Sequence, residues 1–99
     1  MSTREDMLRE QVSALPLDPG VYQFLDRNGT IIYVGKAKSL RKRVSSYFVK
    51  NKDHSAKVQV LVKQICAIQH IVVNSEHDAL LLENSLIKTH KPRYNILLK

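Results

Sequence analysis

The sequence predicts an α+β domain in which a small, three-stranded antiparallel sheet is flanked by helices. Two short segments of β type, joined by Asn28-Gly29, predict a hairpin. Segments with apolar residues at helical spacing lie before and after this hairpin, and a β-branched segment separates the last two of them. We therefore expect the order helix, strand, strand, helix, helix, strand, helix.

Turn and capping residues set the boundaries of these elements. Ser39 and Ser75 occupy N-cap positions, and Pro92 prevents the last helix from continuing. Residues 49–56 are polar and predict a loop. The predicted elements are helix 3–14, strand 20–26, strand 30–35, helix 40–48, helix 57–67, strand 68–74 and helix 76–89.

The composition favours a nucleic-acid partner. Sixteen Lys and Arg against nine Asp and Glu give a net charge of +7 in 99 residues, which suits a polyanion. No apolar run is long enough to span a membrane, and the first ten residues lack the features of a signal peptide, so we expect a cytoplasmic protein. Cys66 is the single cysteine, which excludes an internal disulfide and a cysteine-based zinc site.

Glu83 is an acidic residue in the middle of an apolar helix face. Its neighbours one turn away are Ala79, Leu80, Leu86 and Ile87. Burial of a carboxylate is costly unless it is paired or binds a metal, so the alternatives are a structural salt bridge and a metal or acid–base site. A single carboxylate with water ligands suits Mg²⁺.

Tyr22 and Tyr33 lie on the two strands of the predicted hairpin. If the hairpin loop has two or four residues, Tyr22 lies opposite Gly35 and both hydroxyls project from one face. A three-residue loop would place them on opposite faces. The two tyrosines are either core residues with satisfied hydroxyls or a pair directed at a water or a phosphate.

Basic residues form two clusters. The first contains Lys36, Lys38, Arg41, Lys42 and Arg43. Arg43 borders the buried stripe of its helix and can reach inward, where its planar guanidinium suits a phosphate. Lys38, Arg41 and Lys42 are interpreted either as a solvated face or as contacts to the DNA backbone.

The second basic cluster follows the Glu83 helix. Its members are expected to contact DNA phosphates, and they are Lys88, His90, Lys91 and Arg93. Asn95 either contacts a phosphate or sugar or forms a turn.

Several strings of the sequence together resemble the GIY-YIG nuclease family, and in particular its UvrC-like branch. Gly20-Val21-Tyr22 and Tyr33-Val34-Gly35 match the two tripeptides that name the family. The longer matching strings are Tyr33 to Lys38, Leu40, Arg43, Tyr47-Phe48, Ala79 to Glu83, Leu86 to Lys88 and Lys91 to Asn95. The resemblance covers residues 15–99.

The resemblance implies a role for individual side chains. It makes Glu83 the ligand of one divalent ion, Mg²⁺ or Mn²⁺, Arg43 the active-site arginine and Tyr33 the general base. Further active-site positions implied by the resemblance are Tyr22, Lys36, Tyr47 and Asn95.

The resemblance also implies an activity and partners. It implies a metal-dependent DNA endonuclease domain, monomeric, that makes the 3′ incision in damaged duplex DNA during nucleotide excision repair. UvrC-like proteins continue beyond this segment, so we expect residues 1–99 to be one domain of a longer chain that meets the UvrB–DNA complex through regions absent here. The alternatives are a GIY-YIG nuclease of another role and a non-catalytic nucleic-acid-binding module.

Overall fold

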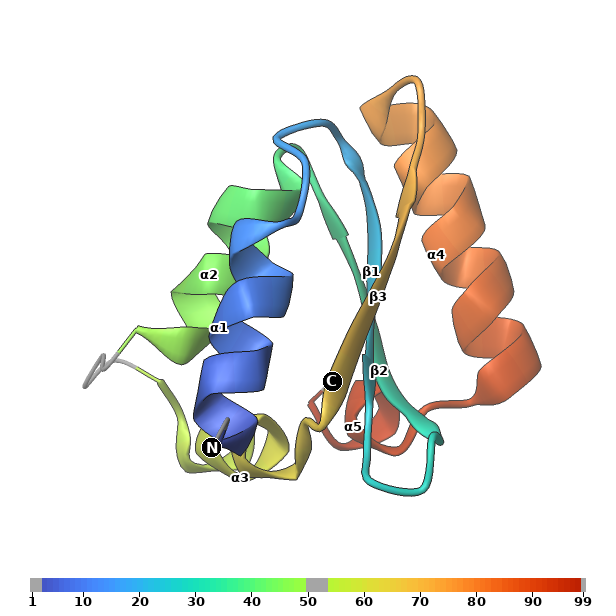
Figure 1. The fold of residues 1–99 in the computed structure, drawn as a ribbon. Helices are drawn as coiled ribbons and strands as arrows, with labels where there is room; N and C mark the ends of the chain where they lie inside the picture. Colours follow the sequence, from blue (N-terminus) through green and yellow to red (C-terminus); the bar gives the residue numbers. More distant parts are fainter. Residues whose placement is uncertain (1–2, 50–53, 99) are drawn as a thin grey trace.

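A computed structural model describes residues 3–49 and 54–98 and shows the predicted α+β architecture (Figure 1). The elements are α1 (Arg4–Ser13), β1 (Gly20–Leu25), β2 (Ile31–Ala37), α2 (Leu40–Phe48), α3 (Ala56–Gln64), β3 (Ala67–Val72), α4 (Glu76–His90) and α5 (Arg93–Leu97). The seven predicted elements are present in the predicted order, and α5 is an addition. The predicted loop at 49–56 includes residues 50–53, which lie outside the described residues.

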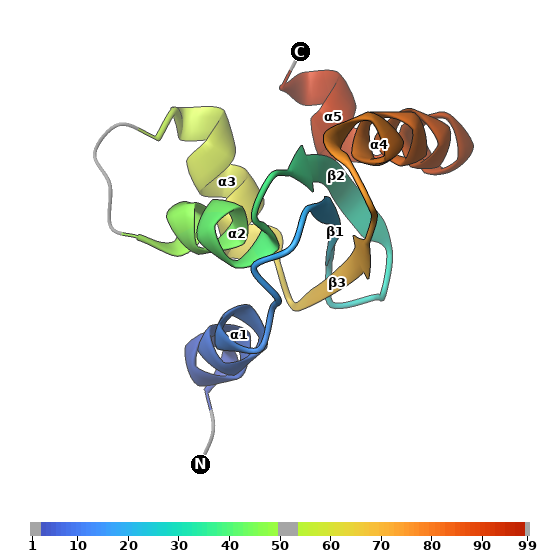
Figure 2. The same cartoon turned by 90° about the horizontal axis from the view of Figure 1, so that it is seen from above.

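The sheet has the strand order β2-β1-β3 and is antiparallel throughout. All six residues of β1 are buried because this strand is central and both of its faces are covered. Helices α1, α2 and α3 lie on one face of the sheet, and α4 covers β1 and β2 on the other face (Figure 2). The short helix α5 lies beside the edge strand β2 and contributes Tyr94 to the cluster on the first face.

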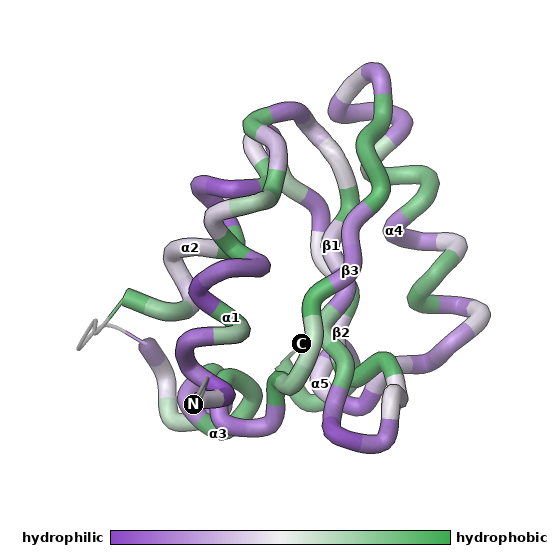
Figure 3. Tube along the Cα trace, in the orientation of Figure 1, coloured by the Kyte–Doolittle hydropathy of each residue, from purple (hydrophilic) through white to green (hydrophobic). Residues whose placement is uncertain are grey.

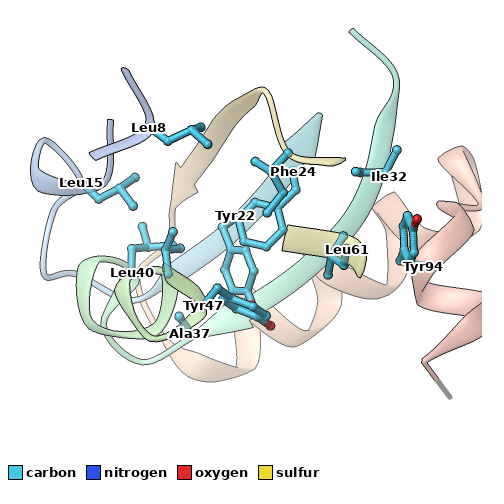
Figure 4. Packing of buried hydrophobic residues seen from close by; sticks show 12 residues of the cluster. Leu8, Leu15, Tyr22, Phe24, Ile32, Ala37, Leu40, Tyr47, Leu61 and Tyr94 are labelled. Atoms are coloured by element: carbon cyan, nitrogen blue, oxygen red, sulfur yellow. The ribbon is translucent and has the colours of Figure 1, made fainter. Parts of the chain in front are cut away.

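Each face of the sheet carries its own apolar cluster. The larger one contains Tyr22, Phe24, Leu40 and Leu61, which pack between the sheet and the first three helices (Figure 4). The smaller one contains Val21, Val34 and Ala79, against which the apolar side of α4 packs. Figure 3 shows the matching hydropathy, with a hydrophilic tip on the β1–β2 hairpin. Burial of each large side chain stabilises the fold by about 1.5–3 kcal/mol.

A capping box and the side chain of Arg4 fix the start of α1. Thr3 and Asp6 form a capping box at the start of α1. The Arg4 guanidinium donates hydrogen bonds to the carbonyl oxygens of Ile65, Val62 and Lys63, at the end of α3 where carbonyls lack helical partners. Arg4 thereby ties the start of α1 to the end of α3.

The hairpin reaches the expected register by an unexpected route. Tyr22 pairs with Gly35 and Phe24 pairs with Tyr33, as predicted for a loop of two or four residues. The turn instead has three residues between Asp26 and Thr30, whose backbones are hydrogen-bonded, and only Gly29 has a positive φ. A one-residue irregularity after Phe24 compensates for the odd turn, so both tyrosines keep the same face.

The boundary between α3 and β3 differs from the prediction, and so does the end of the chain. Helix α3 ends at Gln64 and β3 begins at Ala67, because the chain turns at Ile65 and the Cys66 amide already donates to the Leu25 carbonyl. Helix α5 is too short for a periodic pattern and is held by the burial of Tyr94. In the described part of the chain, no helix is both long and apolar enough to cross a membrane.

Candidate active site at the β2 edge

Three phenols and one guanidinium form a compact cluster on the α2 side of β2. The hydroxyls of Tyr22 and Tyr47 are 2.8 Å apart and hydrogen-bonded, and the Tyr33 ring centroid lies 6.3 Å from that of Tyr22 and 6.4 Å from that of Tyr47. The Nη2 atom of Arg43 donates to the Tyr47 hydroxyl at 3.4 Å, and the Arg43 Cζ atom lies 5.2 Å from the centroid of the Tyr47 ring. The predicted inward reach of Arg43 is confirmed, and Figure 4 shows Tyr22 and Tyr47 side by side.

Gly35 makes room for this phenol cluster. A Cβ atom at this position would lie 2.3 Å from both Cζ and Oη of Tyr22, its cross-strand partner. Only a residue without a side chain therefore allows the Tyr22 ring to lie over β2. The glycine fixes the direction in which the Tyr22 hydroxyl points.

The phenols of this cluster resist ionisation. Burial raises the pKa of Tyr22 and the pKa of Tyr33 above the usual value of 10.0, and the pKa of Tyr33 is raised further by the neighbouring Tyr47 and by the negative charge of Glu83. Burial likewise raises the pKa of Tyr47. At neutral pH all three are hydrogen-bond donors, and one of them can accept a proton only if a nearby cation lowers its pKa.

Glu83 lies on α4, the helix that packs against β1 and β2. It is half-buried, and its charge is close enough to act on Tyr33. Among residues 3–49 and 54–98 the one ion pair is between Lys38 and Glu76, so the structural salt bridge considered for Glu83 is absent there. Leu80 is 40% exposed, contrary to prediction, because the packed side of α4 runs along Ala79 and Leu82 and leaves Leu80 outside it.

A metal at this site would have one carboxylate ligand from the described residues. No group of three His, Cys, Asp or Glu side chains comes together anywhere in the ranges 3–49 and 54–98. A half-buried carboxylate without an ion pair fits a single hard cation that keeps most of its water ligands, as Mg²⁺ does.

Asn95 holds the backbone of β2. Its Nδ2 atom donates to the Val34 carbonyl and its Oδ1 atom accepts from the Val34 amide, both at 2.8 Å. The sequence left a phosphate contact and a turn open as alternatives, and this pair of hydrogen bonds is neither of them. Val34 directly follows Tyr33, so Asn95 fixes the strand that carries the proposed base.

The remaining basic residues of the first cluster lie in different environments. Lys36 is exposed on β2, and the Lys38 Nζ atom lies 3.5 Å from a carboxylate oxygen of Glu76. Arg41 donates to the Leu15 carbonyl at 2.7 Å, so its guanidinium has a structural partner in addition to solvent. Lys42 is exposed.

The second basic cluster lies at the other end of α4. Lys88, His90, Lys91 and Arg93 are all exposed, and Lys91 adopts a left-handed backbone conformation (φ 45°) that ends the helix. Glu76, beside Lys38, begins the same 15-residue helix, so the two clusters are separated by about 22 Å of helix. The fold therefore does not join them into one patch.

Comparisons with known proteins agree with the fold. Residues 18–96 match the family model of the UvrC-like GIY-YIG domain. The UvrABC system protein C of Christiangramia forsetii is 63% identical over 92 residues, and that of Flavobacterium psychrophilum is 64% identical over 92 residues. Each match covers 93% of this chain and 15% of the relative, so the chain spans about 15% of the length of these relatives.

Solved structures are similar over most of the domain. The GIY-YIG N-terminal endonuclease domain of UvrC from Thermotoga maritima, bound to magnesium as its catalytic divalent cation, superposes with a TM-score of 0.79 at 36% identity. The match covers 90% of this chain and 96% of that one. Tyrosine-to-phenylalanine variants and an asparagine-to-alanine variant of the same domain, also bound to the cation, match equally well. By sequence and by fold, this chain belongs to the UvrC-like GIY-YIG domain family.

Proposed function

We propose that this domain is a divalent-metal-dependent DNA endonuclease that hydrolyses a phosphodiester bond, and that it makes the 3′ incision at damaged DNA in nucleotide excision repair. The observation that carries the proposal is a half-buried carboxylate without an ion pair in the described residues, Glu83, whose charge acts on Tyr33, a member of the cluster of three phenols and an arginine. A module that only binds nucleic acid explains the charge of +7, but it does not require this arrangement.

Glu83 would hold one Mg²⁺ or Mn²⁺. The magnesium-bound domain from Thermotoga maritima supports this choice. Bound there, the cation supplies Lewis-acid stabilisation of the scissile phosphate and of the leaving oxygen.

The side chains of the cluster would divide the remaining work. Arg43 and Lys36 would stabilise the negative charge that develops on the non-bridging phosphate oxygens. Tyr33, ionised to the phenolate once a bound cation lowers its pKa and its own proton has gone to solvent, would accept a proton from the attacking water, and the hydrogen-bonded pair Tyr22–Tyr47 would position that water. The P–O bond to the 3′ oxygen breaks as the new P–O bond forms, and the departing oxygen takes a proton from solvent, leaving a 5′ phosphate and a 3′ hydroxyl.

The solved variants support this set of residues by chemical type. In the Thermotoga maritima domain, tyrosine and asparagine positions were substituted in structures bound to the catalytic cation. The present cluster contains three tyrosines, with Asn95 on the adjoining backbone.

Partners follow from the relatives. Because they are components of the UvrABC system, we propose that the longer chain acts on damaged duplex DNA with UvrB, in the cytoplasm, and that this domain itself is monomeric. Residues 1–99 would form one domain of that chain, with the UvrB contact made by other regions.

Incision of DNA in defined metal conditions tests the proposal. Supercoiled plasmid is incubated with the domain in Mg²⁺, in Mn²⁺ and in EDTA, and nicked product is expected in the first two only. In a second arm, the domain replaces its counterpart in a full-length UvrC, and 3′ incision of a lesion-bearing duplex is measured with the other UvrABC components. The proposed role would be contradicted if the chimaera lost the 3′ incision but still made the other cut, and if the same UvrC with its own domain put back made both cuts.

A further inference from the structure

A basic groove adjoins the phenol cluster without containing its phenols. The groove has a volume of about 730 Å³ and lies between α2 and the first turns of α4. Lys42 and His77 contribute to its lining from the two helices. Ala79 and Leu80 add an apolar surface from α4. The combination of cations and exposed apolar side chains matches the two parts of a nucleotide, a phosphate and a sugar with its base.

We propose that this groove binds the nucleotide next to the scissile phosphate, with Lys42 and Lys38 at its phosphate and Leu80 against its sugar or base. The inference rests on the proposed nuclease function and adds a defined path for the substrate strand. A volume of this size is typical of small-molecule sites and can contain one nucleotide.

Shared residues connect the groove with the reactive centre. Lys36 and Arg43 line the groove, and Arg43 also donates to Tyr47 in the phenol cluster. Ala79 and Leu80 precede Glu83 by four and three residues, which is one helical turn, or about 5.4 Å along the axis. A DNA strand whose scissile phosphate lies at Glu83 and Arg43 therefore continues directly into the groove.

Two side chains of the groove lack the surroundings that a purely structural role would give them. The Ser39 hydroxyl is buried and has no hydrogen-bond partner in the described part of the chain, although Ser39 occupies the N-cap of α2. Leu80 is 40% exposed in the wall of the groove, whereas Leu82 and Leu86 of the same helix pack against the sheet. A bound phosphodiester would give the hydroxyl an acceptor, and a sugar or base would cover the leucine.

One residue of the groove opposes an anion. The Glu76 carboxylate lies 3.5 Å from the Lys38 ammonium, and both side chains are largely exposed. In the free protein this pair directs the Lys38 ammonium to Glu76, so a phosphate must compete for it. We therefore expect Glu76→Gln to increase the affinity for a nucleotide, whereas loss of Lys42 decreases it.

Thymidine 3′,5′-bisphosphate, in metal-free buffer, is a suitable probe. Its binding is followed by the NMR shifts of backbone amides, with inorganic phosphate as the second ligand. We expect shifts in residues 36–46 and 76–80 and tighter binding of the nucleotide than of phosphate. Lys42→Ala should weaken both ligands on the order of threefold to fivefold, as for an exposed ion pair, and Leu80→Ala should weaken the nucleotide alone.

Arg27→Ala is the matched control. It removes one exposed cation from the hairpin tip, at the end of the sheet away from the start of α2 (Figure 1), and should leave both affinities unchanged. Equal binding of the two ligands in wild type, or equal effects of Lys42→Ala and Arg27→Ala, would overturn the groove as a nucleotide site. Nicking of plasmid is scored separately, so a domain that cuts DNA without these effects refutes the groove alone. A domain that binds the nucleotide there but cuts neither the plasmid nor, within the full-length chimaera, the lesion-bearing duplex refutes the nuclease.

Discussion

The two sides of the β2 edge hold their polar side chains in different ways. On the α2 side, the hydroxyls of Tyr22 and Tyr47 are buried and hydrogen-bonded to each other, and the missing side chain of Gly35 leaves room for the Tyr22 ring. On the α4 side, Glu83 is half-buried and has no ion pair in the described residues, and the groove beside it is open to solvent.

The difference separates fixed from exchangeable parts. Groups that must keep a geometry are bonded to other protein groups, which costs nothing further when the substrate arrives. Groups that must bind a cation or a phosphate remain available to bind it. The contrast predicts that substitutions of the buried phenols and of Gly35 change stability and geometry together, whereas substitutions of Glu83 or of the groove side chains change binding or chemistry in a fold that persists.

Glu83→Gln should have the largest effect on catalysis. Loss of the carboxylate removes the proposed cation ligand, and Lewis-acid stabilisation is worth several kcal/mol, so nicking should fall on the order of a thousandfold. DNA binding, measured by anisotropy, should remain because phosphates are held by the basic residues. Asp78→Asn removes another acid from the same helix and should cut normally. Equal rates for the two variants would remove Glu83 from the mechanism.

Gly35→Ala should be the most destabilising single change in the phenol cluster. The added Cβ would meet the Tyr22 ring at 2.3 Å, and overpacking of this kind costs about 1–3 kcal/mol of the free energy of unfolding. Urea denaturation measures the loss. Combined with Tyr22→Leu, the same substitution should cost less than the sum of the two single changes; simple additivity would mean that the close approach of this Cβ to the ring does not matter.

Asn95→Ala should slow cutting without weakening DNA binding. The variant loses two hydrogen bonds to Val34, each worth about 1 kcal/mol, and frees the strand next to Tyr33. We expect a lower kcat at an unchanged KM, together with a lower free energy of unfolding. Asn84→Ala, at an exposed position of α4, is the control. A raised KM with normal stability would instead indicate a direct phosphate contact.

Alkaline pH should destabilise the domain through its buried phenols. The pKa values of Tyr22 and Tyr33 are raised in the folded protein, so below pH 10 the protonated phenols leave stability undiminished. Above the usual value of 10.0 the unfolded chain loses these protons first, and stability falls as pH rises toward the folded pKa values. Thermal denaturation across this range should show the decline, and Tyr33→Phe should make it smaller. A decline of the same size in that variant would exclude Tyr33 as a source.

The second basic cluster should have the smallest effect. Lys88→Ala combined with Lys91→Ala removes two exposed cations far from the groove. The slope of log affinity against log salt should decrease by about one for each DNA phosphate that these lysines neutralise in the wild type, with little change in the nicking rate at saturating DNA. An unchanged slope would mean that DNA does not reach this end of α4.

Patterns that depend on local periodicity could be predicted from the sequence. The helical spacing in α4 placed Glu83 on its inner side, and the alternation in β1 and β2 placed Tyr22 opposite Gly35. These features follow from one element or from one pair of adjacent strands.

Features that depend on distant parts of the chain could not be predicted in this way. The bond between Asn95 and Val34 joins residues 61 positions apart, and nothing in the local sequence distinguishes this amide from a turn former. Leu80 was expected to be buried because helical spacing places it on the apolar face of α4. It is exposed because this spacing does not say how far the neighbouring strands extend beneath that face. Helix α5 forms because Tyr94 is buried, which is a tertiary effect.

The irregularity in the β1–β2 hairpin sets a rule for how this segment can change in length. Side chains alternate between faces, so what matters for Tyr33 is whether the number of residues separating it from its partner Phe24 is even or odd. An odd turn followed by one extra residue in the strand gives the even total that keeps Tyr33 on the same face as Tyr22. Insertions or deletions made in twos between these residues keep the phenol where it is. A single one, without a matching adjustment in the strand, turns it toward α4.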